Sequence, residues 1–259
     1  MRVAIISDIH GNAVALESVL RDLAREVIDC TVCLGDVASG GPQPGEVIAR
    51  LRASACPVVM GNMDAWCLDP QPGQGKSKNA RRGGEVRSWG IRQLSTDDLA
   101  FLQSFRHVVD VSLEAVHLLC CHGSPRSNEQ SMAAGTADDG LAEMLSGSRA
   151  TVVAAGHTHT QMLRYYGDTT LLNPGSVGAP IPASERRRRV GQQPSEPRPD
   201  HVWAEYGLVC SERGGLRVEL RRAPVDSAEL VRAARASGMP HADWWLAQRY
   251  GDATGAHGV

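Results

Sequence analysis

The chain has 259 residues, a formal net charge of −2 at pH 7 and 42% hydrophobic residues. A chain of this length buries most of its surface in one large domain or two small ones, so it needs no disulfide or metal ion merely to fold. The small net charge argues against bulk nucleic-acid binding, and no apolar stretch is long enough for a membrane span or a signal peptide. We therefore predict a cytoplasmic protein that has no membrane partner.

The cysteines give no sign of a disulfide framework. There are seven of them, scattered along the chain, and only Cys30 and Cys33 form a C-x-x-C pair. The stretch "CTVCLG" around this pair is typical of a strand, in which the two side chains point to opposite faces. This arrangement disfavours a shared metal ion, so we predict reduced cysteines that pack in the interior.

The first quarter of the chain alternates between predicted strands and helices. Residues 2–7 and 30–35 are apolar runs typical of buried strands, and "CPVVMG" (56–61) predicts a third strand. An apolar stripe over residues 12–26, behind an Asn12 cap, and the segment "GEVIARLRAS" predict the intervening helices. This alternation indicates parallel βαβ units, in which functional groups gather at the carboxyl ends of the strands.

The middle of the chain begins with a Pro-, Gly- and base-rich stretch, residues 67–83, which predicts a loop. Residues 85–94 and 95–105 look helical, and Ser95 or Thr96 would cap the second helix. We therefore predict a helical insertion at about residues 66–106. Strand signals return in three later segments, the last of which contains the Gly-Asp of a hairpin turn: 115–124, 150–159 and 161–176.

The C-terminal part starts with a polar, Pro-rich loop at residues 183–200. Two alternating segments that meet at Gly214-Gly215 then predict an antiparallel pair, and two helices follow. Because we find neither an internal repeat nor a clear linker, we predict a single domain. It comprises residues 1–225, with the C-terminal helices of residues 226–259 packed on it.

Residue types that bind metals follow the predicted strands in five motifs: "SDIHG", "LGDV", "GNMD", "CCHGS" and "AGHTHT". One such residue after a strand is more often a turn residue or a helix cap than a ligand. The joint pattern differs, because parallel strands bring all these loops to one edge of a sheet. Seven side chains would converge there: Asp8, His10, Asp36, Asn62, His122, His157 and His159.

The spacing within these motifs supports convergence. Asp8 and His10 are two residues apart, as are His157 and His159, and an extended chain sends such pairs to one face. A glycine directly before Asp36, Asn62 and His157 permits a bend and close approach of the backbone. Seven mixed oxygen and imidazole ligands exceed the needs of one ion. They suit two ions about 3.5–4 Å apart, an arrangement that holds phosphoryl oxygens and lowers the pKa of bound water.

The order D-x-H, G-D, G-N, H, G-H-x-H resembles the calcineurin-like metallophosphoesterase superfamily. The motifs "SDIHGN", "GNMD", "NPGSVG" and "AEYGLV…VELRRAPVD" are similar to small bacterial phosphodiesterase-like members, which include relatives of diadenosine tetraphosphatases. The resemblance covers roughly residues 1–225 and is thin between 66 and 115. It implies an α/β fold in which a sandwich of two sheets is flanked by helices.

The resemblance also implies a ligand set and an activity. One ion would be held by Asp8, His10, Asp36 and His159, and a second by Asp36, Asn62, His122 and His157. Asp36 would bridge the ions and, with Asn62, serve catalysis, while a hydroxide between the ions attacks phosphorus. The implied enzyme is a hydrolase of a small phosphorylated or nucleotide-type substrate, with diesters preferred to monoesters. Ligands without thiolate fit Mn, our first choice, and also Fe, Zn, Co or Ni.

The sequence departs from the family pattern at Met63. Many members have a histidine after the Gly-Asn, and a thioether has no proton to donate in its place. The substrate could have a good leaving group, or another proton donor such as Asp64, His201 or a metal-bound water could act. In a third alternative, the protein is a catalytically weak metal-binding scaffold. The complete ligand set favours an enzyme.

Four lesser features have a functional and a plain interpretation. Ser124 in "HGSP" lacks the G-x-S-x-G elbow of a nucleophile, so we predict a loop role. The run Arg186–Arg189 could bind an anionic substrate or form a solvated face. The segment "NPGSVG" could shape a phosphate pocket or be a plain turn. Trp244 and Trp245 could stack on a base, but packing of a terminal helix is favoured.

Overall fold

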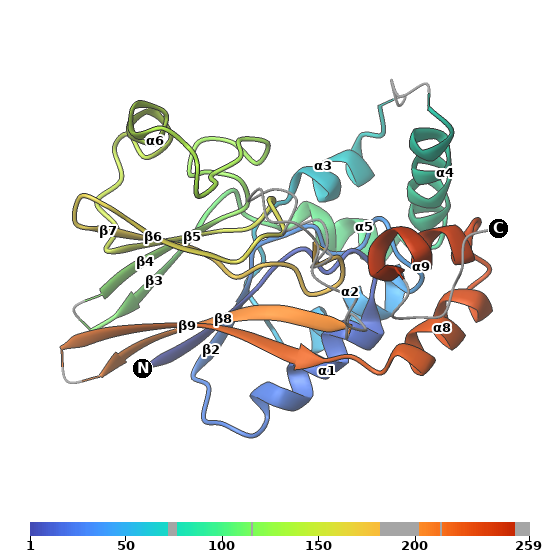
Figure 1. Ribbon diagram of the computed structural model, residues 1–259, viewed down its shortest axis with the longest axis horizontal. Coiled ribbons are helices and arrows are strands. Elements are labelled where there is room, and N and C mark those ends of the chain that lie inside the picture. Colours follow the sequence, from blue (N-terminus) through green and yellow to red (C-terminus); the bar gives the residue numbers. More distant parts are fainter. Residues whose placement is uncertain (72–76, 115, 182–201, 213, 252–259) are drawn as a thin grey trace, which may run out of the picture.

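The computed structural model describes residues 1–71, 77–114, 116–181, 202–212 and 214–251. Two sheets lie face to face, with α1 (Ala13–Leu23) against the outside of the first and α6 (Asp138–Met144) over the second (Figure 1). The remaining helices gather beyond one end of the sheets, where the strands β1, β2, β4 and β5 end (Figure 1). The predicted single-domain α/β sandwich of two sheets flanked by helices is confirmed.

The first sheet has the strand order β2-β1-β8-β9. It consists of β1 (Arg2–Ile6), β2 (Cys30–Cys33), β8 (Trp203–Glu212) and β9 (Gly215–Pro224). The pair β1 and β2 is parallel, whereas β8 runs antiparallel to both β1 and β9. The predicted C-terminal antiparallel pair is therefore confirmed.

The second sheet has the strand order β3-β4-β5-β7-β6. Its strands are β3 (Val109–Leu113), β4 (Val116–Cys121), β5 (Val152–Ala155), β6 (Met162–Tyr166) and β7 (Thr169–Asn173). The three central strands are parallel, and the edge strands β3 and β6 pair antiparallel to their neighbours. The hairpin predicted at the Gly-Asp turn is the β6-β7 pair.

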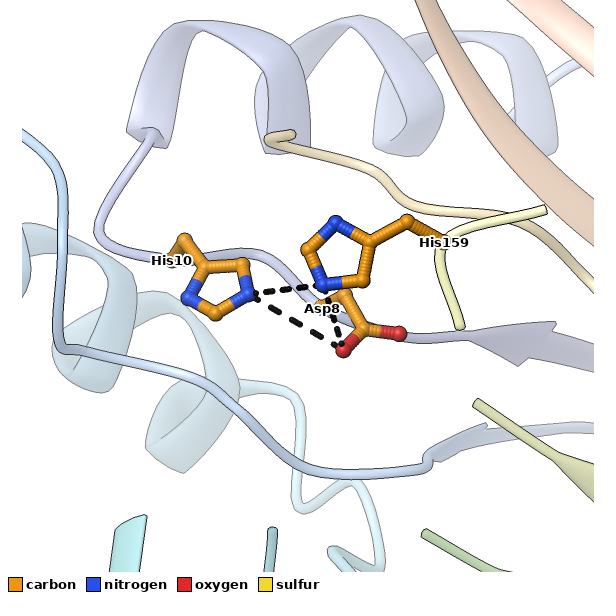
Figure 2. Close-up of side chains that lie close together, drawn as sticks. All are labelled: Asp8, His10 and His159. Carbon is orange, nitrogen blue, oxygen red and sulfur yellow. Dashed lines mark hydrogen bonds and ion pairs between the residues drawn. The ribbon is translucent and has the colours of Figure 1, made fainter. Parts of the chain in front are cut away.

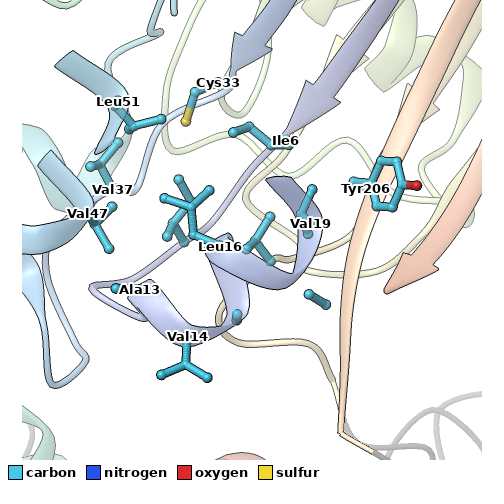
Figure 3. Packing of buried hydrophobic residues seen from close by; sticks show 14 of the residues in the cluster. Ile6, Ala13, Val14, Leu16, Val19, Cys33, Val37, Val47, Leu51 and Tyr206 are labelled. Atoms are coloured by element: carbon cyan, nitrogen blue, oxygen red, sulfur yellow. The ribbon is translucent and has the colours of Figure 1, made fainter. Parts of the chain in front are cut away.

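Three apolar layers hold the sandwich together. The inner layer joins the facing sides of the sheets and includes Ile5, Leu118 and Val152, none of which is exposed to solvent. A second layer packs Leu16 of α1 against the first sheet, and Figure 3 shows this packing. A third layer places Leu141 of α6 against the second sheet. Burial of apolar area on both sides of each sheet is the main stabilising contribution.

Both helix caps that we predicted are present. Asn12 accepts a hydrogen bond from the amide of Ala15 at 3.0 Å, and Ser95 accepts one from Asp98 at 3.2 Å. No helix of the described residues is long and apolar enough to cross a membrane. The helices whose positions were predicted are α1 (Ala13–Leu23), α2 (Pro44–Ala53), α4 (Lys78–Arg92), α5 (Thr96–Gln103), α8 (Ser227–Ala236) and α9 (Ala242–Tyr250).

The predicted third strand at residues 56–61 is wrong. Only Val58 and Val59 form isolated bridges there, and the chain then enters the helix α3 (Asn62–Leu68). The helix begins directly after Gly61, so too few extended residues remain here to form a strand. The next helix, α4 (Lys78–Arg92), also includes residues that we predicted to be a loop, since Ser77 caps it. Neither β3 nor α6 (Asp138–Met144) was predicted.

The C-terminal helix α9 is anchored to the loops at the end of the sandwich. The indole N–H of Trp245 donates to the carbonyl of Gly40 at 2.6 Å, and the Tyr250 hydroxyl donates to that of Gly178 at 2.5 Å. The side-chain amide of Asn12 donates to the Tyr250 hydroxyl at 2.6 Å. Trp245 is only 2% exposed, so its predicted packing role is confirmed.

Replacing Asn12 by alanine is expected to destabilise the fold by about 2 kcal/mol, because a helix cap and a buried hydrogen bond are lost together. The measurement is the free energy of unfolding in urea. Ser95→Ala removes a cap without a tertiary bond and is the matched control, for which about 1 kcal/mol is expected. An equal loss for both variants would contradict a role of Asn12 in anchoring α9.

Candidate metal centre

The seven predicted ligand residues lie together at one end of the sandwich. Asp8 and His10 follow β1, and Asp36 follows β2, both in the first sheet. His122 follows β4, and the pair His157 and His159 follows β5, in the second sheet. Asn62 comes from a third direction, as the first residue of α3. The site therefore lies where the carboxyl ends of strands from both sheets meet.

One group of donor atoms comes from Asp8, His10 and His159, which Figure 2 shows in close contact. The Nε2 atom of His159 lies 3.3 Å from the Asp8 Oδ1 atom and 3.1 Å from the His10 Nε2 atom. The His10 Nε2 atom lies 3.9 Å from the same carboxylate oxygen. Three ligand atoms thus surround a point that a single cation could occupy.

A second group of donor atoms lies around Asn62. Its Oδ1 atom is 2.9 Å from the Nε2 atom of His122 and 3.1 Å from the Nδ1 atom of His157. The His122 Nε2 atom also lies 3.5 Å from the Asp36 Oδ2 atom. Ligand atoms of Asp8, Asp36 and His122 all lie within 4.8 Å of one another, so Asp8 adjoins both groups.

Asp36 lies between the two groups. Its Oδ2 atom is 3.7 Å from the His10 Nε2 atom on one side and 3.5 Å from the His122 Nε2 atom on the other. Its Oδ1 atom accepts a hydrogen bond from the amide of Met63 at 2.8 Å, which fixes the carboxylate plane. This position is the one that a bridging carboxylate requires.

The backbone at the site is not extended, although the two-residue spacing predicted extended chain. Five of the seven residues have left-handed backbone angles: Asp8 (φ 55°), His10 (φ 49°), Asp36 (φ 54°), His157 (φ 64°) and His159 (φ 54°). Such angles are uncommon for residues other than glycine, and they cluster at functional sites because the surrounding structure holds the strain. The side chains converge through these bends and not through strand alternation.

Two of the preceding glycines are required by close approach. A Cβ atom on Gly61 would collide with the Asp36 carboxylate. On Gly156 it would collide with the Ser7 hydroxyl and come within 2.9 Å of the Asp8 Oδ2 atom. Any side chain at either position would displace a candidate ligand, which agrees with the close approach predicted from the sequence.

Backbone carbonyls orient three of the histidine rings. The Nδ1–H of His10 donates to Ser39 at 2.8 Å, that of His122 to Leu34 at 2.7 Å, and that of His159 to Ala179 at 2.7 Å. A carbonyl only accepts, so in the neutral ring the lone pair is on Nε2, which faces the centre. This pattern of orienting hydrogen bonds is common among metal-binding histidines.

The buried carboxylates and imidazoles shift one another's pKa values. Burial raises the pKa of Asp36 to about 7, although the charge of His122 opposes the shift. Burial would also raise the pKa of Asp8, but the nearby His159 outweighs it and the pKa is lowered. Burial opposes protonation of His122 and His159, yet the carboxylates raise the pKa of both. The site therefore stabilises positive charge on these two rings, whereas burial lowers the pKa of His10 and His157.

These residues fit divalent cations. The Asp8 Oδ1 atom is buried and accepts no hydrogen bond from the described residues, although it faces the imidazoles. The Nε2 atoms of His10 and His159 point at each other 3.1 Å apart, and two lone pairs at this distance repel unless a proton or a cation lies between them. Buried carboxylate and imidazole donors in this arrangement suit metal ions.

Asp64 has a positioning role that the sequence did not reveal. Its fully buried carboxylate accepts hydrogen bonds from the amides of Asp36 (2.7 Å), Val37 (2.9 Å) and Gly61 (3.1 Å). It thereby ties the Asp36 loop to the start of α3, which carries Asn62. These bonds occupy the carboxylate and argue against the alternative that Asp64 donates a proton to the substrate. His201, the other side chain considered as a proton donor, lies outside the described residues.

The "NPGSVG" segment supports the Asp8 loop. The amide of Val177 donates to the Ser7 carbonyl at 2.9 Å and that of Gly178 to the Asp8 carbonyl at 3.1 Å. The Ser176 hydroxyl donates to the same Asp8 carbonyl at 2.8 Å. Since these amides are engaged, they do not line a phosphate pocket, and the segment instead holds a candidate ligand in place.

Ser124 has the loop role that we predicted. Its hydroxyl donates to the Gln130 side chain at 2.5 Å and accepts hydrogen bonds from the amides of Arg126 and Ser127. The basic run Arg186–Arg189 lies outside the described residues.

Two arginines close to the site were not predicted from the sequence. Arg87 of α4 and Arg249 of α9 are half-buried and line a cavity beside His10, together with Met63. Neither belongs to a motif, and they are far apart in the chain. Only the packing of α4 and α9 brings them together, so no local signal could have identified them.

The calcineurin-like phosphoesterase superfamily domain matches residues 1–190, which is well over half of the chain, so the chain belongs to this superfamily. Members typically bind divalent metals and act on small phosphorylated substrates. The chain thus combines the fold of this superfamily with a candidate Asp/His metal site. Its specific reaction is a matter for proposal.

One relative and two solved structures are similar to the chain over most of its length. An uncharacterized protein of Methanocaldococcus jannaschii is 27% identical over 195 residues, which are 69% of this chain and 76% of that protein. The crystal structure of a metallophosphoesterase from Sphaerobacter thermophilus is 24% identical, with a TM-score of 0.68, over 96% of this chain and 98% of that one. A hypothetical protein from Pyrococcus horikoshii OT3 is 15% identical, with a TM-score of 0.75 and the same coverage. At these identities, the two solved structures show the fold.

Proposed function

We propose that the protein is a dinuclear metal-dependent phosphoesterase that hydrolyses a P–O bond of a small phosphorylated or nucleotide-type molecule. The observation that carries the proposal is the position of Asp36 between two groups of nitrogen and oxygen donors. Membership of a phosphoesterase superfamily adds independent support. Phosphodiesters or nucleotides are the preferred substrates.

The chain offers ligands for two ions. Asp8, His10, Asp36 and His159 would hold the first, and Asp36, Asn62, His122 and His157 the second. Manganese is our first choice, and other divalent ions with similar ligand preferences are alternatives. When bound, two such ions supply Lewis-acid chemistry, in which phosphoryl oxygens are polarised and water becomes more acidic.

The residues of the chain contribute a rigid arrangement. The Asp36 carboxylate is held by the Met63 amide, and its loop is held by Asp64, so little reorganisation accompanies substrate binding. No protein nucleophile is needed. Ser124 is engaged in its loop, and burial raises the pKa of the Cys67 thiol, in α3 beside the site, to about 12, which leaves it inert near pH 7.

Metal content and turnover test this function together. Elemental analysis of the purified protein is expected to give close to two divalent ions per chain, because each group of donors fits one ion. The protein is then assayed with Mn, Fe, Co, Ni or Zn on phosphomonoesters, phosphodiesters and dinucleoside polyphosphates. Turnover of at least one class should disappear with a chelator and return with metal. A metal-loaded protein that is inactive on the whole panel would favour the scaffold alternative.

A further inference from the structure

A cavity of about 120 Å³ lies next to the candidate metal centre, between the loop that carries His10 and the helices α4 and α9. Its lining combines apolar surface with two cations, and no acidic side chain is among the described residues that line it. The residues that line it include His10, Met63, Arg87, Trp244 and Arg249.

Arg249 points from α9 toward the candidate metal centre. A Cβ atom on Gly40 would lie 3.6 Å from both the Arg249 Nη2 atom and the His10 Nδ1 atom, so the guanidinium is close to this imidazole. Burial lowers the pKa of Arg249, and the carboxylates of Asp8 and Asp36 are near enough to oppose the shift. The neighbouring Trp245 and Tyr250 anchor the helix, which fixes the position of Arg249.

Arg87 brings a second positive charge to the same cavity. Its Cζ atom lies 5.7 Å from the centre of the Trp66 ring. Its positive charge is close enough to Arg249 to contribute to the lowered pKa of that residue. Within the part of the chain that the structure describes, neither guanidinium forms a hydrogen bond or an ion pair. Two half-buried cations without an acidic partner are costly unless an anion binds between them.

The carboxylates of the metal centre do not provide the negative charge that the two arginines need. The carboxylates of Asp8 and Asp36 are the acidic candidate ligands, and two divalent ions would outweigh them. The loaded centre and the two arginines would then form one continuous positive region, which attracts a ligand of high negative charge. A single phosphoryl group at the centre would leave the guanidinium groups unpaired, whereas a second linked phosphate could pair with them.

We propose that Arg87 and Arg249 form a subsite for a second phosphate group of the substrate. This inference rests on the proposed phosphoesterase function and narrows its substrate class to molecules that carry two linked phosphates. This substrate class explains why residue 63 is a methionine and not a histidine. A phosphate that leaves from an anhydride is a weak base, so it needs no proton from residue 63. The face of Trp244 offers apolar contact to whatever the second phosphate carries.

The test compares two non-hydrolysable probes by calorimetry on the manganese-loaded protein: methylphosphonate, with one phosphonate group, and methylenediphosphonate, with two. The diphosphonate is expected to bind at least about tenfold more tightly. Arg249→Gln and Arg87→Gln should each reduce this ratio by about tenfold, because a charged hydrogen-bond partner is lost. Metal content and affinity for methylphosphonate should stay within about twofold, since only the second group contacts the arginines.

Arg82→Gln is the matched control, because Arg82 is also on α4 and lies 6.0 Å from the Trp244 ring but does not line the cavity. In this variant, the ratio of diphosphonate to methylphosphonate affinity should equal that of the protein without substitutions. If Arg249→Gln does not fold, Arg87→Gln still decides the matter. The subsite alone is overturned if the folded arginine variants keep the original ratio of diphosphonate to methylphosphonate affinity. It is also overturned if the protein without substitutions shows no preference for the diphosphonate. Failure of the metal-loaded protein to bind either probe overturns the proposed function and the subsite with it.

Discussion

Asp36→Asn is expected to lower kcat/KM by about 10³-fold or more, because in the proposed function this carboxylate would bridge two ions that supply several kcal/mol of transition-state stabilisation. The fold should survive. Burial already raises the pKa of this carboxyl, so a neutral amide of the same shape is tolerated in the free protein. The Met63 amide can still donate to the side-chain oxygen of asparagine. The measurements are steady-state kinetics on the best substrate of the panel, and metal content by elemental analysis.

Asp110→Asn is the matched control for this variant. Asp110 is an exposed residue on β3, and its Oδ1 atom lies 2.6 Å from the Nε2 atom of His117. It has no contact with the candidate centre. The same chemical change there should leave metal content and kcat/KM unaltered. If Asp36→Asn kept both full metal content and full activity, the assignment of the whole site would be wrong.

The ligand candidates were predictable because each follows an apolar run in the chain. Runs such as "RVAIIS" and "ATVVAA" form β1 and β5, so the order of residues along the chain was enough to place their ends at one edge. The prediction of two packed sheets depended on the family resemblance, since alternation along the chain does not say which strands share a sheet. β1 and β8, far apart in the sequence, are neighbours.

The local geometry at the site was not predictable from spacing. An extended chain was expected at Asp8 and His10, but left-handed turns there aim the side chains at each other. Asn62 was expected in a turn after a strand, but it begins a helix. Such conformations depend on tertiary contacts, for example the three amides that bind Asp64, which hold a backbone that the local sequence alone does not favour.

Met63 connects the predicted and the unpredicted parts of the site. The sequence identified it as a departure from the family pattern, and the structure shows that it does two things. Its amide holds the Asp36 carboxylate, and its half-buried side chain lines the cavity that Arg87 and Arg249 share. A histidine at this position would keep the first role and would bring a proton donor into the cavity.

Met63→His is therefore expected to raise kcat on substrates with poor leaving groups, such as alkyl phosphodiesters, by at least about tenfold more than on aryl phosphates, because general acid catalysis helps strongly basic leaving groups most. The two arginines would lower the pKa of the new imidazole, since like charges disfavour its protonated form. The gain should consequently grow as the pH falls from 8 toward 6. The measurement is the ratio of rates on the two substrate classes across this range.

Met63→Gln separates acid catalysis from mere polarity, because its amide is polar and similar in size but does not give up a proton near neutral pH. It should leave the ratio of rates at its original value. If Met63→His gave an equal gain on both substrate classes, or no gain, the reaction would not be limited by a missing general acid at residue 63. Arg87 and Arg249 would then be the groups that stabilise the leaving phosphate, since they line the same cavity as Met63.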